Sequence, residues 1–198
     1  MSVWRTIWTE PRETVQRVRR GDAAWFVIAV AWCSGVLDLL QSAAMRGSLK
    51  PNWGVFALFL VLVLGPLAGF AHLGIAGPMA AGLGKILGGR ADTSDARVAL
   101  ACGTLPELLA LPLWIPVLAV YGLEIFTTAR ATPGLALLAF AGLQLLLWLW
   151  SFALRLVTLA EVHEFSVLRA FLAVFLSWLV VLAGFVGLLL GVGAFVKK

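Results

Sequence analysis

Ionisable side chains inside apolar sequence are the residues of this chain best able to do chemistry. His72, Glu107 and Arg155 each stand in or next to a long apolar segment. A charge is costly there, so we expect Glu107 and Arg155 to pair or to face water. The simpler alternative is that Arg155 extends to a nearby membrane interface. These three residues form the candidate polar cluster. Asp38 is expected outside it, toward the outer end of the first apolar segment.

A second group of ionisable residues, Glu161, His163 and Glu164, could bind a metal. Their spacing of i, i+2 and i+3 does not put them on one helical face, which favours a solvated connector. The stretch GLGKILGG at 82–89 has a lysine among glycines, but it lacks the order of a phosphate-binding loop and follows no strand. Neither HExxH nor GxSxG occurs. We therefore expect a protein that is not an enzyme and has no catalytic residue, metal or cofactor.

Composition identifies the class of protein. Of 198 residues, 62% are hydrophobic and only 13% are charged. A soluble domain of this length could not hide so much apolar surface, so the chain is expected to be an integral membrane protein. The net charge is +5, and the basic residues lie beside apolar segments, where anionic lipid is a nearer partner than nucleic acid. Cys33 and Cys102 lie in different segments and favour neither a disulfide nor a metal site.

The expected fold is all-α, a polytopic transmembrane bundle of five spans in one membrane domain, 23–198. A Gly-Pro pair at 65–66 is expected to kink or break the second span, and three prolines are expected to break the third. The spans are expected at about 23–44, 53–79, 105–122, 134–156 and 167–196.

Residues 1–22 are expected to form an interfacial amphipathic helix. Trp4 and Trp8 are four apart, hence on one helical face, and tryptophan favours the headgroup level of a bilayer. Arginines occupy the other faces. The alternative is a simple positive flank that orients the first span.

The stretch 80–104 interrupts the apolar segments. Four polar residues at 92–95 predict a helix start, followed by a short helix to Cys102. A solvated connector is the favoured interpretation. The alternative is a docking surface for a cytoplasmic protein.

Small residues indicate how the helices pack. Gly65 and Gly69 give the second span a smooth face. Ala183, Gly187 and Gly191 recur every four residues and form a stripe on the last span. We expect the stripe to pack against the second span. The alternative is a homo-oligomer formed across the last span.

Lysine and arginine predict the orientation. With the N-terminus inside, ten of them fall on inner segments and five on outer ones, which favours a cytoplasmic N-terminus and an outside C-terminus. The inner residues are Arg5, Arg12, Arg17, Arg19, Arg20, Lys85, Arg90, Arg97, Arg155 and Arg169. The outer residues are Arg46, Lys50, Arg130, Lys197 and Lys198.

Three passages carry a resemblance to a known family. They are IWTEPRETVQRV, GKILGGRADTSDARVALACGTLPELLALPLWIP and LAEVHEFSVLRAFLAV. Together they resemble the bacterial branch of the Yip family, the Ypt/Rab-interacting membrane proteins. The resemblance implies five spans, a cytosolic N-terminus and a place in the bacterial inner membrane. The eukaryotic branch is associated with Rab GTPases, but this chain has only AGP at 76–78 where that branch has DLYGP.

Two functions follow as expectations. The first is a non-enzymatic scaffold or adaptor that organises the membrane or offers its inner loops to a partner. The second is a transporter or lipid-handling protein that uses the polar residues inside the bundle.

Overall fold

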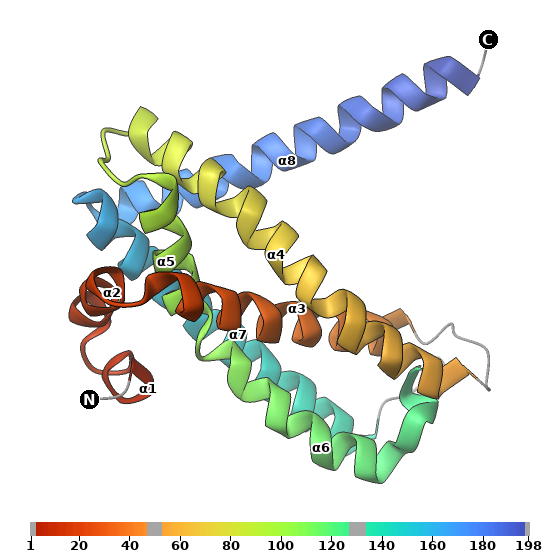
Figure 1. Cartoon of the computed structure of the whole chain (residues 1–198). Helices are drawn as coiled ribbons and strands as arrows, with labels where there is room; N and C mark the ends of the chain where they lie inside the picture. The colour runs from red at the N-terminus through yellow and green to blue at the C-terminus, as the bar shows by residue number, and fades with distance from the viewer. Residues whose placement is uncertain (1–2, 47–52, 127–133, 197–198) are drawn as a thin grey trace.

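Helices make up most of the part of the chain that the structure describes (Figure 1). The computed structural model describes residues 3–46, 53–126 and 134–196, with side chains as far as residue 190, and these residues contain no strand. The all-α prediction is therefore confirmed. In chain order the helices, with η for a 3-10 helix, are α1 (Val3–Thr6), α2 (Pro11–Arg20), α3 (Ala23–Arg46), α4 (Gly54–Ile86), α5 (Thr93–Thr104), η2 (Glu107–Leu109), α6 (Ala110–Tyr121), η3 (Gly122–Phe126), α7 (Leu135–His163) and α8 (Val167–Val196).

Five helical segments are long and apolar enough to cross a membrane. They are α3, α4, the run from α5 to η3, α7 and α8. The polytopic five-span architecture is thus confirmed, although several bounds differ from expectation. Helix α4 reaches Ile86 rather than residue 79, and α7 reaches His163 rather than residue 156. The third segment already begins at Thr93.

Helix α5 lies inside the bundle, which corrects the expectation of a solvated connector. Ala96, Ala99 and Cys102 are fully buried, and α5 packs between α4 and α7. Its small side chains allow this close approach because they add little bulk. Only residues 87–92 remain as a loop between α4 and α5. The surface that this stretch offers to a partner is therefore smaller than expected, and docking of a cytoplasmic protein there stays a prediction.

The α-helix is interrupted in the third membrane-spanning segment, between α5 and α6, and not in the second. Helix α4 continues through Pro66 and Pro78, so the helix does not end at 65–66, and the expected kink there stays a prediction. The chain leaves α-helical geometry between α5 and α6, at residues 105–109. Pro106 contributes to this change because proline has no N–H for a helical hydrogen bond.

Helices α3 and α4 make the closest contact in the bundle. A methyl group added at Gly65 would lie 2.7 Å from the Cα of Val36, and one at Gly69 would collide with the carbonyl of Ala31. One at Gly35 would collide with the backbone of α4. The small-residue face of α4 is therefore occupied by α3, which explains why it is not available to α8.

Helices α1 and α2 cover one end of the bundle, which we call the α2 end (Figure 1). The loop 87–92 and the turn between α7 and α8 lie at the same end. Val15 and Val18 of α2 are buried against α5 and α7. The apolar face of α2 is thus part of the protein core, and its position relative to a bilayer stays a prediction.

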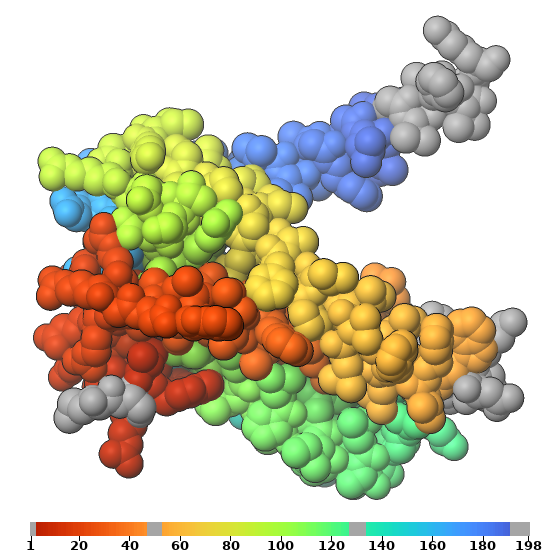
Figure 2. All heavy atoms as spheres, in the orientation of Figure 1, coloured from red at the N-terminus to blue at the C-terminus, as the bar shows by residue number. Residues whose placement is uncertain are grey.

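Helix α8 leaves the body of the bundle (Figures 1 and 2). Its first turns pack on α4 and α7, where Ala170 and Ala173 are fully buried. Farther along, side chains from 179 to 190 are all exposed. The expected packing of the small-residue stripe against α4 is not observed, because α3 already fills the glycine face of α4.

Candidate functional site

Helices α5 and α7 hold the candidate polar cluster in place. A methyl group at Gly103 would lie 2.6 Å from the Cα of Arg155, so glycine permits this close approach of the two backbones. Thr158 of α7 donates a hydrogen bond to the carbonyl of Ala99, with an O–O distance of 2.8 Å. Such hydrogen bonds join membrane helices that gain little from apolar attraction.

Glu107 lies in η2, directly after the turn at 105–106, and its side chain is directed toward α7. Its backbone N–H donates to the hydroxyl of Ser151, 2.9 Å away. The hydroxyl therefore satisfies a donor at the point where the α-helix is interrupted. The Glu107 side chain is held in place beside α7.

Glu107 and Arg155 form an ion pair. Nη2 of Arg155 lies 2.5 Å from Oε2 of Glu107. The side chain of Glu107 is only 12% exposed and that of Arg155 is 23% exposed. Each charge offsets the cost of burying the other, which makes the pair tolerable inside an apolar bundle.

Asp38 and His72 join this pair around one cavity. The cavity has a volume of about 130 Å³ and lies between α3, α4, α5, η2 and α7. Asp38 is about 12 Å along α3 from Arg46, so it lies well inside the helix and not at its end. The structure thus brings His72, Glu107 and Arg155 together. The residues that line the cavity are Ser34, Asp38, His72, Leu73, Thr104, Glu107, Trp148 and Arg155.

Sequence reasoning missed Asp38 as a member of the cluster. Ser34 and Asp38 are four apart and share a helical face, which is the signal that could have found it. The depth of this face depends on where α3 crosses α4, and that crossing is a tertiary feature.

An apolar groove adjoins the cavity. It has a volume of about 270 Å³ and runs between α4, α5, α7 and α8. Phe152, Trp178 and Val181 are among its walls. The residues that line both the groove and the cavity are His72, Leu73, Thr104 and Arg155. The two spaces therefore meet, with polar groups at one end and apolar side chains along the other.

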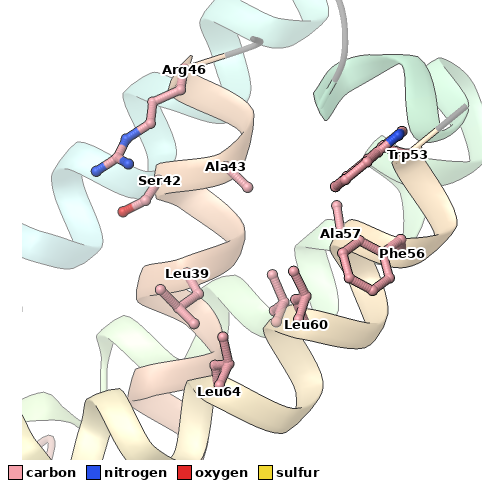
Figure 3. Close-up of a pocket in the computed structure, with 10 residues that line it drawn as sticks. Leu39, Ser42, Ala43, Arg46, Trp53, Phe56, Ala57, Leu60 and Leu64 are labelled. Atoms are coloured by element: carbon pink, nitrogen blue, oxygen red, sulfur yellow. The ribbon is translucent and has the colours of Figure 1, made fainter. Parts of the chain in front are cut away.

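A separate pocket lies at the far end of the bundle (Figure 3). It has a volume of about 380 Å³, and Leu39, Ala43 and Leu64 face its interior between α3 and α4. Arg46 and Ser42 are on its rim, and Figure 3 shows both side chains directed away from α4. The interior of this pocket therefore offers an apolar contact surface and no charged group at its centre.

An ion pair fixes the α2 end. Arg19 of α2 donates to both carboxylate oxygens of Asp95, with Nη2 2.5 Å from Oδ2. Asp92 caps α5 by accepting from the N–H of Asp95 at 2.8 Å. This bond lowers the pKa of Asp92, so the capping contribution is present at neutral pH and is lost as pH falls through that lowered value.

The three residues considered for a metal point in different directions. Glu161 accepts a hydrogen bond from Gln16 of α2 at 3.3 Å, and Glu164 pairs with Arg90 at 3.3 Å. His163 is fully buried and stacks on Phe165. They do not converge on a common point.

Gly84 and Gly89 enclose the His163 imidazole, since a methyl group at either would collide with the ring. Gly84 and Gly89 therefore have a packing role here, which joins the end of α4 and the loop 87–92 to the end of α7. The carbonyl of His163 also accepts from the N–H of Arg90 at 3.3 Å.

The remaining predicted residues are more dispersed. Trp4 is 43% exposed, whereas Trp8 contacts Trp150 of α7 with ring centroids 6.0 Å apart. Ala183 and Gly187 are exposed on α8, and Gly191 is beyond the described side chains. Four cations counted for the orientation, Lys50, Arg130, Lys197 and Lys198, lie outside the described residues.

Taken together, the five apolar helical segments and the buried ion pair define an integral, multi-pass helical membrane protein. The model of the Yip1 domain matches residues 4–188. The chain therefore belongs to the Yip1 domain family. It matches none of the curated proteins and none of the solved structures with which it was compared.

Proposed function

We propose that this protein is not an enzyme and that it binds an amphipathic lipid inside the bundle, as part of a lipid-handling role. The observation that carries the proposal is the junction of a charged cavity with an apolar groove, through His72, Thr104 and Arg155. An ionisable residue inside a membrane bundle is costly and is retained chiefly for function. Here the charged pair lies where a headgroup would meet its chain.

The size and lining of the two spaces support this occupant. The groove has a volume of about 270 Å³ and the adjoining cavity one of about 130 Å³. Taken together, the two spaces fall in the lower part of the ~300–1,000 Å³ range typical of ligand sites. Apolar walls suit an acyl chain, while Arg155 offers hydrogen-bond donors to a headgroup. The Thr104 hydroxyl donates to the carbonyl of Leu100 at 2.9 Å, so it offers an acceptor. Arg155 already pairs with Glu107, so the site supplies binding groups rather than a free nucleophile and base.

The proposed location is the inner membrane of a bacterium, with the N-terminus in the cytoplasm and the C-terminus outside. It is supported by the excess of lysine and arginine on the segments assigned to the inner side. The α2 end is then the cytoplasmic end.

The test is lipid retention. Ala76 lines the groove, so Ala76→Phe should fill it and lower the amount of lipid that stays with the protein after purification in mild detergent. Gly74→Phe is the matched control, because a Cβ added there meets nothing within 4 Å among the described residues. Lipid per protein is measured by mass spectrometry. Equal retention by the two variants and the unaltered protein would contradict the proposal.

A scaffold or adaptor role is the second candidate, and a polar hollow at the α2 end favours it. The hollow has a volume of about 620 Å³, and Arg12, Gln16 and Glu161 are among its lining residues. The Arg19–Asp95 pair holds α2 beside it. The same purification distinguishes the two functions, because a stoichiometric protein partner, and no retained lipid, favours the scaffold.

A further inference from the structure

The charges around the cavity do not balance. Four ionisable side chains line it, Asp38 from α3, His72 from α4, Glu107 from η2 and Arg155 from α7. Arg155 and Glu107 are bonded to each other and cancel. Asp38 then has one remaining group that could compensate its charge, which is His72.

The four groups act on one another electrostatically. The charges that act on Asp38 are those of His72 and Arg155, and those that act on Glu107 are the other three members. Arg97 of α5 packs against Gly77, nearer to the α2 end, and lines neither the cavity nor the groove. From α5 and α8 the described residues facing the two spaces are uncharged, with Thr104 in the cavity and Ser177 in the groove.

An uncompensated charge is expensive in this position. With His72 neutral and both carboxyls ionised, the four groups carry a net charge of −1. Moving one isolated charge from water into an apolar interior is strongly unfavourable even after the surroundings relax. One added proton makes the set neutral, whether it sits on Asp38 or on His72.

We propose that this cavity is a binding site for one proton, carried by Asp38 or His72 and held by the charge balance of the four groups. His72 is exposed along the groove, whereas Asp38 is half-buried. A proton can therefore enter and leave by His72. The inference deepens the proposed lipid site by naming a second, ionic occupant of the same cavity.

Charge counting predicts which variants lose the site. Asp38→Asn leaves the Glu107–Arg155 pair balanced without a proton. Glu107→Gln does the same, because Arg155 can then pair with Asp38. His72→Gln still leaves two carboxyls against one guanidinium, so one carboxyl must keep a proton.

The experiment follows the thermal unfolding of the full chain in detergent, without added lipid, between about pH 5 and pH 9. An unfolded histidine releases its proton near pH 6.5, while the folded cavity keeps one. The folded state then holds more protons, so stability falls with rising pH, by up to tenfold in the folding equilibrium constant per pH unit. His163 is common to all variants, so its titration contributes the same background to each.

The expected result is a stability that falls with rising pH in the unaltered protein, chiefly above about pH 6.5, and in His72→Gln. Asp38→Asn and Glu107→Gln should show no such fall, because their folded cavity needs no proton. If Asp38→Asn does not fold, Glu107→Gln gives the same information. Slopes that survive in both carboxyl variants, or disappear only with His72, would overturn the proton site. Lipid retention is measured separately, so a flat profile with retained lipid refutes the proton and not the proposed function.

Discussion

At the scale of residues, the packing of His163 between two glycines gives a sharp prediction. A methyl group at Gly84 or Gly89 would collide with the imidazole, which is fully buried and cannot move outward without opening the core. We expect Gly84→Ala and Gly89→Ala each to cost about 1–3 kcal/mol, the usual range for overpacking. Unfolding in detergent measures the loss.

Gly82→Ala is the control for this pair. Gly82 is also in α4, but an added methyl group there meets nothing within 4 Å among the described residues. Alanine should stabilise the helix by about 0.5–1 kcal/mol relative to glycine. If all three variants behaved alike, the enclosure of His163 would be refuted.

The residues of the site were predictable in part. His72, Glu107 and Arg155 could be selected because charge in apolar sequence is rare and costly. The place of Asp38 could not, because its depth follows from the contact of Gly35 with α4. Sequence spacing gives the face of a helix, whereas the partner of that face is set by packing.

At the scale of elements, the attachment of α2 rests on one ion pair and a small apolar face. Arg19→Ala should free part of α2 from α5, because it removes both bonds to the buried carboxylate of Asp95. Since Arg19 is 40% exposed, the cost is expected to be modest, about 1 kcal/mol. Hydrogen exchange of residues 11–20 should become faster.

Arg20→Ala provides the comparison, since it removes the same charge from the same helix and Arg20 is exposed. Its α2 exchange should stay close to that of the unaltered protein. Equal acceleration in the two variants would mean that charge alone, and not the contact with Asp95, holds α2.

Elements were predictable to the extent that apolar runs define them. The last span matches its expected range, because Ser166 and the following apolar run mark its start clearly. Helix α5 was assigned to a connector because Asp95 and Arg97 make it look polar. In the structure these side chains find partners or cover within the protein, with Arg19 on Asp95 and Gly77 beneath Arg97. Polar residues in a short helix therefore do not decide whether it is buried.

At the scale of the whole molecule, the charge bias and the fold agree in one respect. The arginine-rich helix α2, the loop 87–92 and the turn after α7 gather at the α2 end (Figure 1). Arg97 and Arg155 lie inside the bundle, so they no longer count toward orientation. Removing these two from the ten inner cations leaves eight against five, and the cytoplasmic N-terminus stays a prediction.

The divergence of α8 sets the last prediction. A Cβ added at Gly184 or Gly187 would meet nothing within 4 Å in the described part of the chain, whereas one at Gly69 would collide with the backbone of α3. Gly187→Leu should therefore leave the unfolding temperature of the monomer unchanged, and Gly69→Leu should lower it severely because α3 and α4 must separate. A comparable loss in both variants would mean that α8 packs on its own bundle after all.

Crosslinking of the same Gly187→Leu variant tests the homo-oligomer, because a stripe that joins two copies loses its close approach when a leucine stands at its centre. A dimer that disappears while the monomer stays folded would assign α8 to that interface. A variant unchanged in both measurements would leave the stripe facing lipid.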